Sequence, residues 1–205
     1  DDLRYPDWRQ TDLGEPIFIV AAPRSGTTFL HRLMSADPRF TTFKLYETIF
    51  PSITAGEAIR TSSTSGRLGE VVTRVRELID HAFDGWEGMH DMGLDKDEED
   101  EALWVLMMAS PTFLIFLPFF ERFARERFID RIEPAARARI MRTYREVLQR
   151  KLYANPGRTL LMKSVFMPGR MGVIEEAAPA VRFVYVVRHP YESIPSTLSL
   201  FTKPW

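Results

Sequence analysis

Cysteine is absent from this chain of 205 residues, and long apolar runs and net charge are almost absent too. Without cysteine the chain has no disulfide framework and no thiolate metal site, which suits a reducing compartment such as the cytoplasm. No apolar run approaches the roughly 20 residues of a membrane-spanning helix. The formal net charge is −1, so the chain as a whole does not attract nucleic acid or anionic membranes. Any anion site must therefore be built locally.

The residues that are present suffice for one core, since 45% are hydrophobic and 12% aromatic. Short apolar segments at residues 17–22, 159–162 and 181–187 are typical of buried parallel strands. We expect a weaker fourth strand at residues 40–45. Helical patterns follow the three stronger strands, which predicts an α/β fold with a parallel sheet flanked by helices.

The middle of the chain, at about residues 66–155, reads as a helical insertion in a single domain covering residues 1–205. Helices are expected at residues 67–83, 98–109 and 134–153. The third strand lies close to Trp205, so we expect that a C-terminal part of the domain is missing from this sequence or is supplied by another chain. The acidic run at residues 95–101 reads as a solvated loop and helix start, and no metal is expected.

The segment at residues 21–28 leads from the first strand into a helix in a way that suits a phosphate group. Backbone N–H groups of a first helical turn lack partners within the helix and can bind an anion. Gly26 permits a positive φ, and Arg24 can bind two oxygens at once. Hydroxyl groups add further donors. The predicted phosphate-binding residues, in a sheet of P-loop type, are Arg24, Ser25, Gly26, Thr27 and Thr28.

The same segment departs from the nucleoside-triphosphatase pattern G-x-x-x-x-G-K-[ST]. Gly26 and Thr28 match the pattern, but Ala21 stands in place of the first glycine and Thr27 in place of the lysine. The missing lysine disfavours a P-loop kinase that uses ATP. An ordinary strand–turn–helix with an exposed turn is the plain alternative.

A second anion site is predicted after the strand at residues 181–187. Arg188 stands at the carboxyl end of that strand, where open α/β sheets bind ligands. Pro190 can open a helix, and Ser196 lies further into it, with Pro195 removing one helical hydrogen bond. Arg188 alone would read as a surface arginine. Combined with the first loop, it indicates a ligand with two separated phosphates.

Together, the run Pro-Arg-Ser-Gly-Thr-Thr at residues 23–28 and Val-Arg-His-Pro followed by Ser196 resemble the sulfotransferase family. The resemblance implies 3′-phosphoadenosine 5′-phosphosulfate as the sulfate donor. It also implies that residues 24–28 hold the 5′-phosphosulfate and that Arg188 and Ser196, eight residues apart, hold the 3′-phosphate. Arg24 stands where cytosolic members carry lysine, which is similar to the bacterial and protein-tyrosine branches.

Catalytic residues follow from the same resemblance and from the needs of sulfuryl transfer, which requires a proton acceptor and cations. Arg24 is the candidate for the bridging oxygen, and Lys163 for the sulfuryl group. Cytosolic members carry a catalytic histidine where this chain has Val165. The branch that Arg24 resembles uses a glutamate downstream of the phosphate loop, and Glu47 stands in about that place, so the resemblance implies Glu47 as the base, with a surface or helix-capping role as its alternative. His90 is a weaker candidate for contacting the acceptor.

The leading hypothesis is a sulfotransferase that acts on a hydroxyl or amine of a small-molecule or polymer acceptor. No nucleic-acid partner and no membrane span are expected, and a homo-oligomer is left open. Residues 113–120 could line an apolar acceptor pocket or a subunit contact, although plain core is the simpler interpretation. A P-loop kinase and a nucleotide-binding protein without catalysis remain as alternatives.

Overall fold

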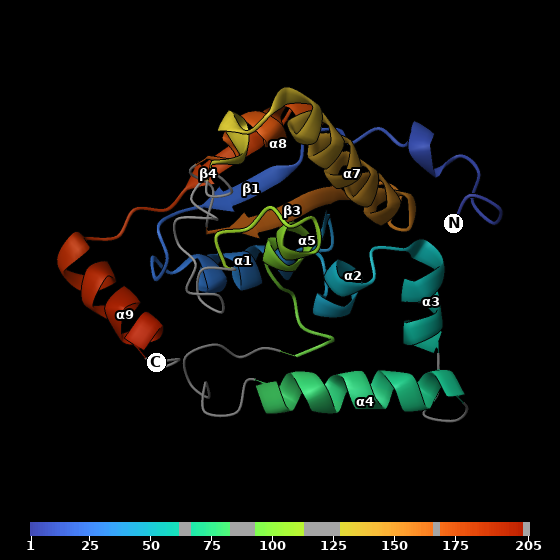
Figure 1. The fold of residues 1–205 in the computed structure, drawn as a ribbon, viewed down its shortest axis with the longest axis horizontal. Helices are drawn as coiled ribbons and strands as arrows, with labels where there is room; N and C mark the ends of the chain where they lie inside the picture. The colour runs from blue at the N-terminus through green and yellow to red at the C-terminus, as the bar shows by residue number, and fades with distance from the viewer. Residues whose placement is uncertain (62–66, 83–92, 113–127, 166–168, 203–205) are drawn as a thin grey trace.

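The fold is that of a computed structural model, which describes residues 1–61, 67–82, 93–112, 128–165 and 169–202. Its strands form a four-stranded parallel sheet in the order β2-β3-β1-β4 (Figure 1). The strand bounds are β1 Ile17–Val20, β2 Phe40–Thr41, β3 Thr159–Ser164 and β4 Arg182–Tyr185. Helices lie on both faces of this sheet, which confirms the predicted α/β class.

The apolar segments at residues 17–22 and 159–162 pair in the centre of the sheet, where β1 lies between β3 and β4. The strand expected at residues 40–45 is wrong beyond Thr41, since β2 pairs with β3 over only two residues. The main-chain N–H of Lys44 donates to Glu47 Oε2 at 2.8 Å, and this capping contact begins a helix at Leu45. The helix start therefore ends the strand early.

Helices occur near the predicted places, and two of them differ from expectation. The first is the helix expected at residues 98–109, which covers only Glu101–Leu106 because the residues before it bind other elements. The second is α2, Leu45–Ile49, which takes the last residue of the strand expected at residues 40–45. In the described ranges no helix is long and apolar enough to cross a membrane. The helix bounds are η1 Trp8–Gln10, α1 Thr27–Ser35, α2 Leu45–Ile49, α3 Ile53–Thr61, α4 Arg67–Ala82, α5 Glu101–Leu106, η2 Ile129–Arg131, α7 Pro134–Tyr153, α8 Met171–Ala177 and α9 Pro190–Thr202.

Alternate residues of the central strands face opposite layers of helices. Phe18 of β1 and Leu160 and Met162 of β3 belong to the main core, together with residues of α7 and α8. Lys163 falls on the other face by the two-residue period of a strand, toward α1. Figure 1 shows α7 and α8 on one side of the sheet and α1 on the other. The phosphate loop and the end of β3 therefore share one face.

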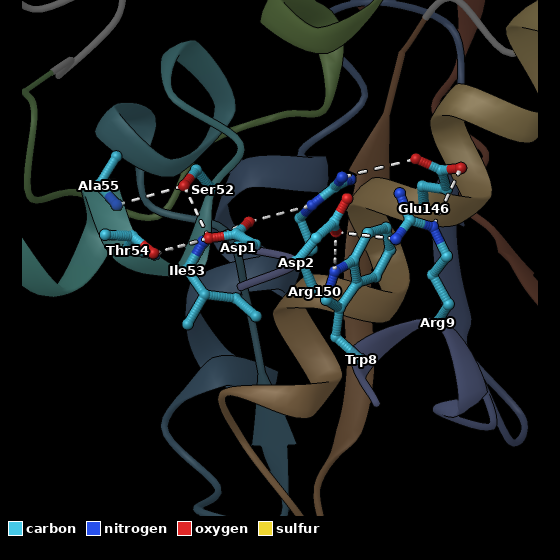
Figure 2. A network of polar contacts seen from close by, with 10 residues as sticks. All are labelled: Asp1, Asp2, Trp8, Arg9, Ser52, Ile53, Thr54, Ala55, Glu146 and Arg150. Carbon is cyan, nitrogen blue, oxygen red and sulfur yellow. Dashed lines mark hydrogen bonds and ion pairs between the residues drawn. The ribbon is translucent and has the colours of Figure 1, made fainter. Parts of the chain in front are cut away.

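The start of the chain is tied to α3 and α7 by a polar network (Figure 2). The Asp1 carboxylate accepts hydrogen bonds from the main-chain N–H groups of Ile53 and Thr54, at the first turn of α3. It also accepts one from Arg150 Nε of α7 at 3.1 Å. The guanidinium of Arg150 lies 3.7 Å from the ring centroid of Trp8, which is fully buried. This network caps a helix from a distant part of the chain.

Candidate nucleotide-binding site

The loop between β1 and α1 has the backbone shape of an anion cradle. Arg24 and Gly26 have positive φ values of 64° and 88°, which turns successive peptide groups toward the same side. The N–H groups of Gly26, Thr27 and Thr28 find no acceptor in the described part of the chain. Strained backbone with unused donors at the carboxyl end of a strand suits a bound anion.

The two predicted anion motifs, more than 160 residues apart, meet in space. Arg24 Nε donates to Ser196 Oγ at 2.9 Å, and Arg188 donates from Nη1 to the main-chain oxygen of Arg24 at 3.0 Å. Thr197 Oγ1 donates to the oxygen of Pro23 at 3.3 Å. These contacts follow from the sheet, because β1 and β4 are parallel neighbours and their carboxyl ends lie side by side.

Lys163, near the end of β3, also contacts the phosphate loop. Its side chain is 1% exposed, and Nζ donates to Thr28 Oγ1 at 3.1 Å. Glu99 supplies the counter-charge, with Oε1 at 3.1 Å from the same nitrogen. A buried ammonium therefore lies directly behind the first turn of α1, compensated by one carboxylate.

His31 lies one turn further along α1 and is 1% exposed. Burial lowers its pKa to about 4, and the charge of Lys163 acts in the same direction, so the imidazole is neutral at pH 7. Its Nε2 has no hydrogen-bond partner among the residues that the structure describes.

Glu47 lies in the first turn of α2 and has two partners. Its Oε2 accepts from the N–H of Lys44, and Lys151 Nζ of α7 lies 2.6 Å from it. The side chain lines a cavity of about 180 Å³ whose other walls come from α2, α3 and α7. No residue of the phosphate loop lines that cavity. Glu47 thus has the capping contact named as its alternative, while its role as base stays a prediction.

The solvated loop expected for the acidic run is wrong at residues 97–101, where two of the five side chains are buried. Glu98 is 6% exposed and Asp100 is fully buried. The carboxylates of this acidic segment bind different partners on several elements, so they do not converge on one ion. The contacts are Asp97 with Thr42 and Lys44, Glu99 with Lys163, Asp100 with Trp104 and Tyr144, and Glu101 with Arg170.

Glu98 is a candidate site residue that the sequence did not single out. Burial raises its pKa to about 7, and the nearby charge of Lys163 opposes that rise. Its carboxylate accepts no side-chain hydrogen bond within the described ranges, while its N–H donates to the oxygen of Phe43 at 3.0 Å. Within the run, no local feature separates Glu98 from its acidic neighbours. His90 and residues 113–120 lie outside the described residues.

The fold and this site define an α/β protein of the P-loop type, with its anion loop at the carboxyl edge of a parallel sheet. A family model described as "Sulfotransferase family" matches residues 16–205. The chain therefore belongs to the sulfotransferase family, a family of enzymes. The resemblance carried by the two anion motifs is confirmed.

Relatives and solved structures agree with this assignment. The chain is 29% identical over 189 residues to the omega-hydroxy-beta-dihydromenaquinone-9 sulfotransferases Stf3 of Mycobacterium bovis and Mycobacterium tuberculosis, covering 90% of this chain and 45% of theirs. Its fold is similar to sulfotransferase STF9 from Mycobacterium avium, with a TM-score of 0.71 and 18% identity over 99% of this chain and 50% of that one. It is also similar to sulfotransferase STF1 from Mycobacterium tuberculosis, with a TM-score of 0.70 and 18% identity over 100% of this chain and 54% of that one. The chain thus spans about half the length of these proteins.

Proposed function

We propose that this protein transfers a sulfuryl group from 3′-phosphoadenosine 5′-phosphosulfate to a hydroxyl or amine of an acceptor. The observation that carries the proposal is the contact between the two anion motifs, in which Arg24 binds Ser196 and Arg188 binds the Arg24 main chain. A mononucleotide with one phosphate needs only the first motif. The second motif suits a donor that carries an additional phosphate on its ribose.

The residues present fit that donor. The unused N–H groups of Gly26, Thr27 and Thr28 would hold the 5′ end, together with the Ser25 and threonine hydroxyls. Arg188, whose side chain is 42% exposed, and Ser196 would hold the 3′-phosphate. When bound, the donor supplies an activated sulfuryl group. Arg24 and Lys163 would then stabilise the negative charge that develops during transfer. No metal is part of this proposal.

The proton of the acceptor needs a base, and two carboxylates are candidates for that role. The sequence favours Glu47 by its place downstream of the loop. The contacts favour Glu98, because it is buried beside Lys163 and lacks a side-chain donor, whereas Glu47 is bound by Lys151. A base whose pKa lies near neutral pH is well matched to general-base catalysis. Comparing the Gln variants of the two residues separates the candidates.

The decisive variant is the one that binds the nucleotide normally and fails to turn over. If Glu98→Gln lowers the transfer rate by about a hundredfold while Glu47→Gln leaves it unchanged, Glu98 is the base. The reverse result assigns the role to Glu47. Losing bisphosphate binding in either variant would show a structural role for that carboxylate instead.

For the acceptor, the name of the Stf3 relatives suggests a starting point. Those proteins are named for an omega-hydroxylated dihydromenaquinone. We therefore propose an acceptor with a nucleophilic hydroxyl, to be sought first among hydroxylated isoprenoid quinols. Transfer of labelled sulfate to a panel of lipid, sugar and peptide alcohols tests this class.

Donor specificity is tested by calorimetry with 3′,5′-adenosine bisphosphate and with AMP. We expect tighter binding of the bisphosphate, and Arg188→Ala should reduce that preference by about tenfold because a charge-assisted contact is lost. Arg182→Ala is the control, since it removes an exposed arginine that begins β4, the strand before Arg188, and pairs with Glu15. Equal affinity for the two nucleotides in the wild-type protein would overturn the proposal. Magnesium-dependent ATP binding would favour a kinase instead.

A further inference from the structure

The acidic segment at residues 97–101 binds to the end of β3 through its main chain. The Asp100 N–H donates to the main-chain oxygen of Lys163 at 3.4 Å. The Asp100 carboxylate is fully buried and accepts hydrogen bonds from Trp104 Nε1 at 2.8 Å and from the Tyr144 hydroxyl at 2.7 Å. The residue next to Glu99 is thus fixed to α5, α7 and β3.

The acidic segment contacts the ammonium group of Lys163 through Glu99. A lysine side chain has four rotatable bonds and a compact charge, so burial alone does not set where the ammonium lies. Its Nζ has two partners at equal distance, Thr28 Oγ1 and Glu99 Oε1, each at 3.1 Å. Thr28 belongs to the phosphate loop, whereas Glu99 belongs to the acidic segment.

The two partners differ in what they contribute. A hydroxyl oxygen can accept a hydrogen bond from the ammonium but cannot neutralise its charge. An ammonium at 1% exposure needs a counter-charge to remain there. Glu99, with 14% of its side chain exposed, is the carboxylate that pairs with it. Removing that carboxylate leaves the lysine stem free to turn away from the loop.

We infer that Glu99 is a positioning residue that holds the Lys163 ammonium against Thr28, so that its charge already faces the reacting group before the donor arrives. The inference rests on the proposed function and deepens it, since it assigns Glu99 an indirect role that is exerted through Lys163. A charge that is already in place needs no reorganisation during the reaction. It therefore stabilises the transition state more than a charge that must first move.

The test uses Glu99→Gln, which keeps the shape and removes the charge, in the full protein. We expect kcat to fall by about tenfold, the scale on which groups supporting a reacting residue act, while KM for the donor changes less than about twofold. Affinity for 3′,5′-adenosine bisphosphate should be unchanged, because that ligand lacks the sulfuryl group. Glu99→Asp keeps the charge and should recover part of the rate. Glu176→Gln is the matched control, since it removes a carboxylate that pairs with Arg137 on α7.

A double-mutant cycle with Lys163→Ala decides whether Glu99 acts through Lys163. In that background Glu99→Gln should cause no further loss of kcat. Losses that multiply would overturn the inference, as would a Glu99→Gln variant that binds the bisphosphate and transfers at the wild-type rate. Failure of the wild-type protein to prefer the bisphosphate over AMP would instead refute the proposed function, and this role with it. If Glu99→Gln does not fold, the Glu99→Asp variant carries the same cycle.

Discussion

Two polar regions lie at opposite ends of the strands, and they differ in whether their hydrogen-bond donors have acceptors within the protein. Beyond the amino ends, Asp1, Arg150 and Trp8 bind one another and the first turn of α3 (Figure 2). Beyond the carboxyl ends, the loop leaves the N–H groups of residues 26–28 without acceptors among the described residues. Figure 1 shows α3 near the first region and α9 near the second.

The difference separates a structural network from a candidate binding site. In the first region the Asp1 carboxylate has donors from Ser52, Ile53, Thr54 and Arg150, and its side chain is 5% exposed. Such a network contributes to folding and has little capacity left for a ligand. In the second region, donors and positive φ values are kept in an arrangement that a bound anion would stabilise.

The strongest way to test the contrast is to remove Arg24. Arg24→Ala should lower the sulfuryl-transfer rate by about a hundredfold, because one preorganised donor at the reacting group is lost. The free energy of unfolding should change by less than about 0.5 kcal/mol. Transfer assays and urea unfolding measure the two effects. Arg39→Ala, at an exposed arginine that pairs with Asp37, is the control. An unchanged rate would contradict the assignment of Arg24 to the site.

The opposite result is expected in the network beyond the amino ends. Arg150→Met keeps an unbranched apolar side chain at this position and removes the guanidinium that lies over Trp8 and binds Asp1 and Glu146. The free energy of unfolding should fall by about 2 kcal/mol, since a mostly buried carboxylate loses its charged donor.

Bisphosphate affinity measured on the folded Arg150→Met protein should not change. The same substitution at Arg39 should cost less than about 0.5 kcal/mol, because an exposed pair contributes little. Chemical denaturation of the two variants checks both values. Weaker nucleotide binding in Arg150→Met would show that the two networks are coupled.

The smallest expected effect concerns pH and Glu98. Burial raises the pKa of Glu98 from an ordinary 4.5 to about 7. The protonated Glu98 side chain contributes to the free energy of unfolding. This contribution is fully present below the pKa of the unfolded state and is lost as pH rises through the pKa of the folded state. Between pH 5 and pH 6 this loss should be about 1 kcal/mol in the free energy of unfolding. Glu98→Gln should remove that part of the slope.

Asp97 provides the control for this pH prediction. Burial acts to raise the pKa of Asp97, but hydrogen bonds from Lys44 and Thr42 outweigh it and the pKa lies below its ordinary value. The Asp97 carboxylate is therefore ionised in both states above pH 5, and Asp97→Asn should lower stability without changing the slope. Burial raises the pKa of Asp100 to about 6, so Asp100 contributes to the pH dependence of stability in the wild type and in Glu98→Gln alike. Equal slopes in wild type and Glu98→Gln would contradict the burial of an ionisable Glu98.

Much of the sheet could be predicted because its signals are local. The apolar runs that become β1, β3 and β4, and the glycine that turns the loop into α1, each lie within a few neighbouring residues. Residues 40–45 were harder to predict, because a capping contact by Glu47 competes with strand pairing for the same short segment.

The acidic segment was misread for a different reason. Five neighbouring acidic residues look alike in sequence, and their fates depend on partners as distant as Lys44 and Arg170. Glu47 shows the same limit, because its ion pair with Lys151 joins residues more than 100 positions apart. Patterns within a window cannot reveal which charge will meet which.

The sequence by itself determined the order of strand, loop and helix, the position of Gly26, and the spacing of Arg188 and Ser196 that led to the sulfotransferase family. Only the tertiary structure decided that Arg24 meets Ser196 and that Lys163 is buried between Thr28 and Glu99. The physical reason is the parallel sheet, which gathers at one edge the carboxyl ends of strands that are far apart in the chain. Charges that meet there acquire partners, burial and pKa values that no local pattern encodes.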